Sequence, residues 1–172
     1  MKFRGIVLAT AVALCFLLAP GRAQAAQSMF LEISGVPGEA TTPAAFVNQI
    51  AVLAVSWGGS KSCGGPLNLQ DVSLSKYVDK ASTLLLAAMR DNTVYPTATL
   101  RFVRTDGGVY TSYQFTNAKL SSLSTGGSGG EDRNTENVTL SFSQVQITYT
   151  FFDANGKPGA TTSTTVVAGA CL

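Results

Sequence analysis

The segment from Ser124 to Phe142, STGGSGGEDRNTENVTLSF, joins a run of glycines to a cluster of acidic residues. Consecutive glycine amides can bind a phosphate, and paired carboxylates can act as acid and base or ligate calcium. A P-loop, however, continues from its last glycine into Lys and Ser or Thr at the start of a helix. Here Gly130 is followed by Glu131 and Asp132, which repel phosphate, and then by an alternating strand pattern. The segment therefore indicates a connection between strands and not a phosphate site.

The rest of the chain offers little else that could react. It contains no histidine, which removes the most frequent general base, the Ser-His and Cys-His nucleophile pairs and the commonest zinc ligand. The acidic residues are scattered, apart from Glu131, Asp132 and Glu136. The segment 153–156, DANG, begins like a calcium loop, but Lys and Pro follow where further oxygen ligands are needed, so it is predicted to be a hairpin turn. The sequence predicts no enzyme, no metal and no cofactor.

The first 25 residues have the pattern of a secretory signal peptide. Lys2 and Arg4 precede an apolar run from Ile6 to Leu18, and the small-residue site Ala-Gln-Ala ends at Ala25. This run is shorter than the roughly 20 residues of a membrane-spanning helix, so a retained anchor is the less favoured alternative. We expect cleavage after Ala25 and a single mature domain from 26 to 172. That domain is expected to be secreted or periplasmic, with no membrane attachment.

Cleavage also changes the charge of the protein. The full chain has 12 basic and 10 acidic residues, and three of the basic ones, Lys2, Arg4 and Arg22, lie in the signal peptide. The mature domain is therefore slightly acidic, and it has no run of Lys and Arg. Because nucleic acids and anionic membranes are bound by clustered basic residues, we expect neither as a partner.

Two cysteines, Cys63 and Cys171, remain after cleavage. An oxidising compartment favours a disulfide between them. Closing so long a loop would stabilise the fold by about 4 to 5 kcal/mol in the chain-entropy model. Two unpaired thiols, or cysteines that pair between chains, are the alternatives.

The mature chain is predicted to be mainly β, because short alternating runs are separated by turn residues. The expected strands are 29–34, 47–57, 97–104, 109–116, 137–152 and 161–167, with hairpin turns at 106–108 and 153–156. The strand 47–57 is apolar on both alternation sets, so we expect it to be covered on both faces. Near Ser143 and Gln144 the alternation changes phase, which predicts an inserted residue and a bend of the kind that closes a barrel.

One helix is predicted, from Lys80 to Asn92. Apolar residues recur there at helical spacing and are expected to pack on the sheet: Ala81, Leu84, Leu85, Ala88 and Met89. Asp79 or Ser82 can cap the first turn, and Arg90 suits the negative end of the helix dipole. The expected fold is a two-sheet β-barrel with one flanking helix.

Four segments of the mature chain resemble the haemolysin-coregulated protein (Hcp) family, the tube proteins of type VI secretion. They are MFLEISGVPGEA at 29–40, SWGGS at 56–60, LSKYVDKAS at 74–82 and the long STGGSGGEDRNTENVTLSFSQVQITYT at 124–150. The resemblance implies a two-sheet barrel with one helix and subunits that close into hexameric rings. It further implies that rings stack into a tube, propelled by a contracting sheath, whose lumen carries effectors.

The resemblance also suggests contact residues. In the family the loop after the first strand reaches towards the neighbouring ring, which would place Thr42, Pro43 and Ala44 at stacking contacts. A polar edge is expected to pair with the neighbouring subunit, and it consists of Glu131, Asp132, Arg133 and Glu136.

The signal peptide departs from the family, because type VI tube proteins leave the cytoplasm through the secretion apparatus itself. Two functions therefore stay open. The first is a structural ring or tube protein that carries or accompanies secreted effectors. The second is an exported ring that binds peptides or effectors without forming part of a contractile tube.

Overall fold

The computed structural model describes residues 27–127, 129–130 and 132–168. The predicted signal peptide, Glu131 and Cys171 lie outside these residues. Within them, no helix is long and apolar enough to cross a membrane. The described elements are β1 (Ser28–Ile33), η1 (Ala44–Phe46), β2 (Ile50–Val52), β3 (Ala54–Ser56), β4 (Gly59–Lys61), β5 (Leu67–Leu69), β6 (Val72–Tyr77), α1 (Lys80–Arg90), β7 (Tyr95–Val103), β8 (Val109–Gly126), β9 (Thr135–Ser141), β10 (Gln144–Phe152) and β11 (Pro158–Val167).

Nine of these strands form one antiparallel sheet, with the order β2-β1-β7-β8-β9-β6-β3, and β10 joins β8 to β11. The path begins with β2 and ends with β3, which are consecutive segments separated by Leu53. The Leu53 N–H donates to the Ser75 carbonyl in β6. The sheet thus curls around a core without a ladder that closes it fully. The mainly β architecture with one flanking helix is confirmed, but the expected two-sheet barrel is instead one strongly bent sheet that does not close.

The long strand β8 bends and so divides the sheet into two halves, one with β7 and β10 and the other with β9. Its first half pairs with β7 and β10 and its second half with β9, and Asn117, at φ 53°, lies at the bend between them. Opposite this bend, β9 ends and β10 begins, and the Ser143 N–H donates to the Thr116 carbonyl. The predicted bend near Ser143 is confirmed. The inserted residue is not, because the register is unchanged across the bend and shifts instead at Ser121 of β8.

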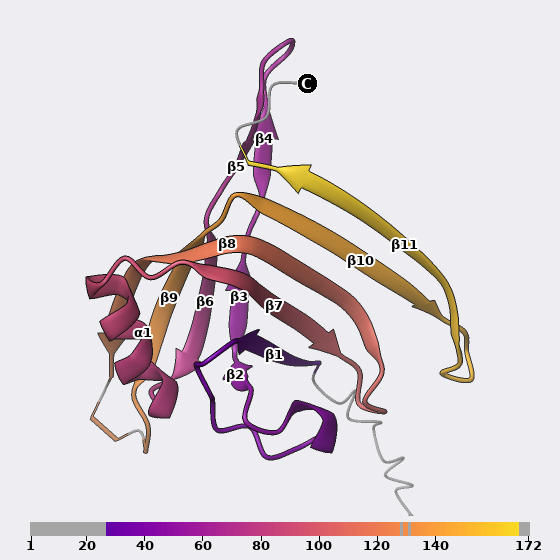
Figure 1. Ribbon diagram of the computed structural model, residues 1–172. Helices are drawn as coiled ribbons and strands as arrows, with labels where there is room; N and C mark the ends of the chain where they lie inside the picture. The colour runs from indigo at the N-terminus through magenta and orange to yellow at the C-terminus, as the bar shows by residue number, and fades with distance from the viewer. Residues whose placement is uncertain (1–26, 128, 131, 169–172) are drawn as a thin grey trace, which may run out of the picture.

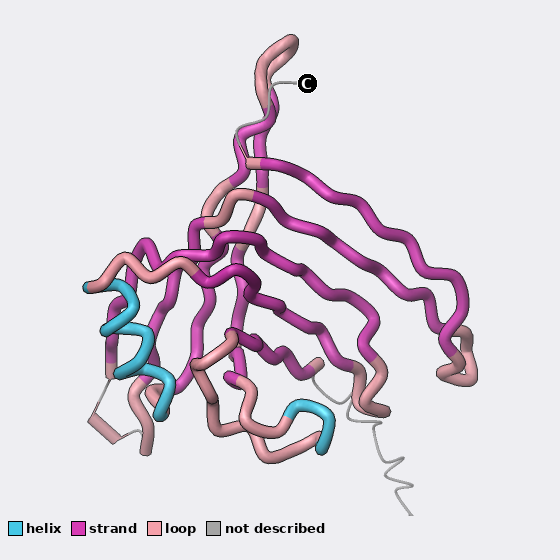
Figure 2. Tube along the Cα trace, viewed as in Figure 1, coloured by secondary structure: helices cyan, strands magenta, loops and turns pink. Residues whose placement is uncertain are grey.

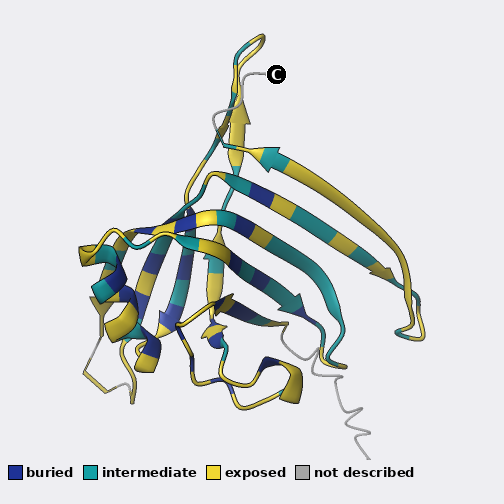
Figure 3. Cartoon of the chain, in the orientation of Figure 1, coloured by how far each residue is buried: buried dark blue, intermediate teal, exposed yellow. Residues whose placement is uncertain are grey.

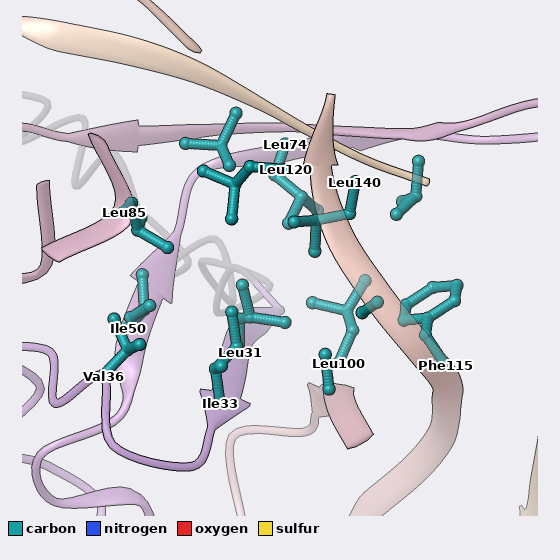
Figure 4. Close-up of a cluster of buried hydrophobic side chains, with 14 of the residues drawn as sticks. Leu31, Ile33, Val36, Ile50, Leu74, Leu85, Leu100, Phe115, Leu120 and Leu140 are labelled. Atoms are coloured by element: carbon teal, nitrogen blue, oxygen red, sulfur yellow. The ribbon is translucent and has the colours of Figure 1, made fainter. Parts of the chain in front are cut away.

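The main core lies between the two halves of the sheet (Figure 4). It is built from alternate residues of several strands, which point inward because side chains alternate along a strand. Leu31, Leu74, Leu100, Phe115 and Leu140 are each at most 1% exposed. A second, smaller core lies on the other face of β1 and β7, where Phe46 stacks on Phe30 at 4.8 Å.

Helix α1 packs against β8 at one side of the molecule (Figure 1). The Asp79 carboxylate accepts from the Ala81 N–H and the Ser82 hydroxyl accepts from the Asp79 N–H, which forms a capping box. Both predicted capping residues are therefore used. Ala81, Leu85 and Ala88 are buried as predicted, but Leu84 is 42% exposed.

Two expectations about strands need correction. The strand 47–57 is split, and Leu53 on its second alternation set is 44% exposed, because α1 packs near β8 and does not cover β2. Strands β4 and β5 were not predicted, and they form a separate two-stranded hairpin that stands away from the body (Figure 2).

Both predicted hairpin turns are confirmed. Asp106 Oδ1 accepts from the Gly108 N–H between β7 and β8, and this bond, together with Arg104, lowers the pKa of the Asp106 carboxyl. Asp153 Oδ1 accepts from the Lys157 N–H between β10 and β11. The segment that resembled a calcium loop is therefore a turn held by its own aspartate.

Candidate assembly interface

The core-facing side of the sheet continues beyond the core. On β10, Val145 is fully buried and Ile147 is half-buried, whereas Tyr149 and Phe151 on the same alternation set are 48% and 51% exposed. Figure 3 shows β10 passing from buried near the body to exposed farther out, beside β11, which is exposed along nearly its whole length. We call this side of β10 beyond Val145, which consists of the half-buried Ile147 and the exposed Tyr149 and Phe151, the apolar sheet face. Large apolar side chains in a row are unusual on a monomer surface and mark a contact with another molecule.

A cavity lies where this face meets the core. It has a volume of about 220 Å³ and is lined by Val55, Trp57, Val72, Leu100, Phe102, Tyr113 and Phe115. Trp57 lies 5.7 Å from Tyr113, measured between ring centroids, and its indole nitrogen has no hydrogen-bond partner among the described residues. Tyr113 in turn lies directly opposite Ile147 in the sheet. The aromatic cluster is therefore the inner end of the same apolar surface.

The opposite side of the same strands is polar and uncharged. Thr148 lies within 3.2 Å of Ser163, and Thr150 within 3.2 Å of Thr161, measured between hydroxyl oxygens. We call this the hydroxyl face, and it consists of Ser112, Gln114, Thr116, Gln144, Gln146, Thr148, Thr150, Thr161, Ser163 and Thr165. Residues 109–116, 144–152 and 158–167 contain no charged side chain. One side of this part of the sheet is thus suited to contact with protein and the other to contact with water.

Glu136, expected at a polar edge, is instead buried. It is 1% exposed, and its carboxylate accepts from Lys76 Nζ at 2.7 Å and from the Ser82 hydroxyl at 2.7 Å. Lys76 Nζ also donates to Asp79 Oδ1 at 2.7 Å and to the Tyr77 carbonyl at 2.8 Å. A buried charge is tolerated only when it is paired and hydrogen-bonded in this way. Glu136 therefore joins β9 to β6 and α1 within the subunit and is not available to a neighbour.

Asp132 and Arg133 are exposed, as an interface residue must be. Arg133 approaches Glu39 at 3.5 Å, and its guanidinium carbon lies 4.8 Å from the centre of the Tyr77 ring. Glu39 also accepts from the Lys80 N–H at the start of α1. The glycine-rich segment is thus connected to the loop after β1 and to the helix. Glu131 lies outside the described residues.

The loop after β1 returns to the body and does not extend from it. Gly38 N–H donates to the Asn48 carbonyl, Ala40 N–H donates to the Gln49 carbonyl, and Phe46 is buried on Phe30. At the turn of this loop, Thr42 and Ala44 are exposed and Pro43 is half-buried. The element that does extend is the β4–β5 hairpin, which carries Cys63 in an exposed position. Because Cys171 lies outside the described residues, the disulfide stays a prediction.

No group of three or more His, Cys, Asp or Glu side chains with a metal-binding arrangement occurs in the part of the chain that the structure describes. Of the three acidic residues that could have acted together, Glu136 is held by Lys76 within the subunit, and Glu131 lies outside the described residues. Sequence reasoning missed the apolar sheet face. The alternation of Val145, Ile147, Tyr149 and Phe151 does predict that this strand has one apolar side. It does not reveal at which residue the core stops covering that side.

Comparison with known proteins gives a consistent result. Residues 30–149 match the family described as "Type VI secretion system effector, Hcp". The chain is 41% identical, over 143 residues, to the protein hcp1 of Pseudomonas aeruginosa, an alignment that covers 76% of this chain and 88% of that protein.

Solved structures agree. The structure titled "Structure of a type six secretion system protein" superposes with a TM-score of 0.76 at 27% identity, covering 80% of this chain and 92% of the other. Hcp1 from Salmonella typhimurium gives 0.72 at 26% identity, covering 83% and 95%. The chain therefore belongs to the Hcp family of type VI secretion proteins.

Proposed function

We propose that the mature chain assembles into a closed ring, expected to be a hexamer, which acts as a structural component that carries or accompanies secreted effectors. The observation that supports this most directly is the apolar sheet face, on which Tyr149 and Phe151 are about half exposed in a single subunit. A second subunit that covers these rings would gain roughly 25 cal/mol for each Å² of apolar surface removed from water.

The edge of the sheet supports assembly as well. In the described residues β11 pairs with β10 alone, so its other edge has free backbone N–H and C=O groups. Soluble proteins usually protect such an edge with charged residues, bulges or a covering segment. The sequence of β11, PGATTSTTVV, has no charge along this edge. A neighbour that lies against the apolar sheet face would also lie next to the edge.

The hydroxyl face then faces the bore of the ring in our proposal. This face carries Ser, Thr and Gln side chains and no charged ones. It therefore binds water well and attracts neither acidic nor basic cargo strongly. Such a lining suits a channel that must release what it carries. The absence of histidine from the chain fits a role without catalysis.

Contacts between stacked rings are proposed at two places. The turn with Thr42, Pro43 and Ala44 is accessible, although the loop itself is anchored to the body. The β4–β5 hairpin extends farther and is exposed along β4. Shortening the hairpin between Ser60 and Asn68 is expected to leave hexamers intact and to abolish longer tubes in electron micrographs.

The glycine-rich segment stays in the proposed interface through Glu131, Asp132 and Arg133, while Glu136 is excluded by its burial. Reversing the charge of Glu131 and Asp132 to Lys tests this contact. Weaker hexamers are expected, and hexamers of unchanged stability would remove these residues from the interface.

Size-exclusion chromatography with light scattering tests the ring itself. We expect the mature protein to have six times the subunit mass. Tyr149→Glu should raise the subunit concentration at which rings dissociate by at least about tenfold, as expected for a buried aromatic contact. Gln146→Glu, on the opposite face of the same strand and exposed, is the matched control. A wild-type chain that stays monomeric at high concentration would contradict the proposal.

The signal peptide favours a second function, an exported ring that binds peptides or effectors outside any contractile tube. The two are separated by expression in a strain that lacks sheath and baseplate. A mature chain that begins near Ala26 and accumulates in the periplasm of that strain supports the exported ring. Retention of the uncleaved chain in the cytoplasm until a sheath is supplied supports the tube.

A further inference from the structure

The cavity at the inner end of the apolar sheet face lies between the two halves of the sheet. Val55 and Val72 come from β3 and β6, whereas Leu100 and Phe115 come from β7 and β8. Val72, Leu100 and Phe115 also belong to the main core and are each at most 1% exposed. The cavity therefore has a buried apolar base, and its lining is complete within one subunit.

Aromatic rings form the more accessible side of this cavity. Trp57, Phe102 and Tyr113 are half-buried. The ring centroids of Trp57 and Tyr113 are 5.7 Å apart with planes tilted by 56°, and those of Phe102 and Tyr113 are 5.3 Å apart with planes at 73°. Tilted and edge-to-face pairs at this separation are favourable for aromatic rings. We call this space the aromatic cavity, because a further ring that enters it can make contacts of the same kind.

Trp57 also supplies a hydrogen-bond donor that is not used within the subunit. Its indole nitrogen is buried and has no partner among the described residues. A buried indole N–H usually has a partner, and leaving it without one costs free energy. A single water satisfies it poorly, because a buried water needs about two to four polar partners and Tyr113 is the only other polar side chain in the lining. The cavity thus favours a ligand that brings one acceptor.

The volume and charge of the cavity limit the ligand further. The volume of about 220 Å³ exceeds the roughly 150 Å³ of an engineered apolar cavity that binds benzene, and it is below the roughly 300 Å³ at which pockets for larger ligands begin. None of the lining residues is charged, so a carboxylate or an ammonium group would be buried without a partner. One aromatic ring with a short neutral substituent fits both limits.

We propose that the aromatic cavity binds a small neutral molecule with one aromatic ring and one hydrogen-bond acceptor, such as an aryl ketone. The ring of the ligand packs among Trp57, Phe102 and Tyr113, and its acceptor oxygen takes the Trp57 N–H. This inference goes beyond the proposed ring assembly and does not depend on it, since all lining side chains belong to one chain.

The single tryptophan makes the test direct. Mature protein labelled with nitrogen-15 in tryptophan gives one indole cross-peak, from Trp57, and acetophenone is titrated against it. We expect a saturable downfield shift of the indole proton, with the dissociation constant measured by calorimetry. Ethylbenzene, which has the same ring without the carbonyl, should bind about three- to tenfold more weakly. Cyclohexyl methyl ketone, which keeps the carbonyl on a saturated ring, should also bind more weakly.

Substitutions locate the binding. Val55→Phe places a ring in the cavity at a half-buried position and should weaken acetophenone binding at least about tenfold. Val109→Phe is the matched control, because Val109 is also half-buried and does not line the cavity. Trp57→Phe should remove the preference for acetophenone over ethylbenzene, whereas Tyr113→Phe should keep it. Thermal unfolding checks that each variant is folded.

Three results would overturn the inference. The absence of a saturable shift would show that the cavity holds water only, and hexamers seen by light scattering would leave the proposed ring unaffected. Equal affinities of the wild-type protein for acetophenone and ethylbenzene would remove Trp57 as the donor. Binding that appears only after rings have dissociated would assign the cavity to a side chain of the neighbouring subunit.

Discussion

Replacing Lys76 with Met should destabilise the subunit strongly, although Met keeps most of the apolar stem. The Lys76 ammonium donates to Glu136, Asp79, Ser82 and the Tyr77 carbonyl, at 2.7 to 3.2 Å. Its removal leaves two carboxylates with side chains only 1% and 6% exposed and no cation beside them. Breaking a buried ion pair from one side costs about 3 to 5 kcal/mol, because the remaining charge is left without compensation.

Urea unfolding measures this loss. With a dependence of about 2 kcal/mol per M of urea, the midpoint should fall by about 2 M. The fluorescence of Trp57, the only tryptophan, and far-UV circular dichroism follow the transition. Subunit concentration is held constant, and light scattering confirms the same assembly state, because assembly itself adds stability.

A double-mutant cycle makes the test specific to the pair. Glu136→Leu alone should cost less than Lys76→Met, because Lys76 keeps Asp79 as a partner. The double variant should be more stable than the sum of the single effects requires, since neither charge is then buried alone. The reasoning would be refuted if Lys76→Met lowered the urea midpoint by less than about 0.5 M. It would also be refuted if the losses of unfolding free energy in the two single variants added up to the loss in the double variant.

Three further results are expected. Acrylamide quenching of Trp57 should decrease as rings form, because Trp57 lines the cavity at the inner end of the apolar sheet face, and quenching independent of concentration would contradict this. If Cys63 and Cys171 pair, the mass of the non-reduced mature chain should be two hydrogens below that of the reduced chain. Cys63→Ser should then lower the free energy of unfolding by about 4 to 5 kcal/mol, and two free thiols in the monomer would disprove the disulfide. Gly38→Ala should cost about 1 to 3 kcal/mol in urea unfolding, because a Cβ there would overlap the Gln49 carbonyl, and an unchanged midpoint would show that the loop can shift.

The fold could largely be predicted from the sequence because its signals are local. Helix α1 was placed by apolar spacing and by Asp79 and Ser82 at its start, and both capping bonds are present. The turns at Asp106 and Asp153 were placed by glycine and aspartate in the same way. Strand β6 was missed because the apolar alternation in VSLSKY is short and Lys76 stands at the next inward position. That lysine is buried, and only its partners on β9 and α1 explain why.

The candidate interface was predicted less well, because it depends on which faces stay uncovered after folding. Acidic residues near the glycine-rich loop suggested a polar edge, but the charge of Glu136 is satisfied by a residue 60 positions earlier in the chain. Conversely, Tyr149 and Leu86 follow patterns typical of a core, and nothing local distinguishes them from Val145 or Leu85, which are buried. Which core-like residues stay exposed can be seen only in the complete folded subunit.

The buried charge network explains how helix α1 is attached to the sheet. A surface helix of eleven residues depends on its inner stripe for attachment, and here that stripe contains two alanines, Ala81 and Ala88, beside Leu85 and the partly buried Met89. The network of Lys76 and Glu136 supplies additional attachment at the first turn, through the Ser82 hydroxyl and the capping carboxylate. These polar bonds therefore fix the helix from inside, where its apolar stripe contributes little area. Loosening the network with Lys76→Met should therefore weaken the attachment of α1 to the sheet as well as the folded subunit.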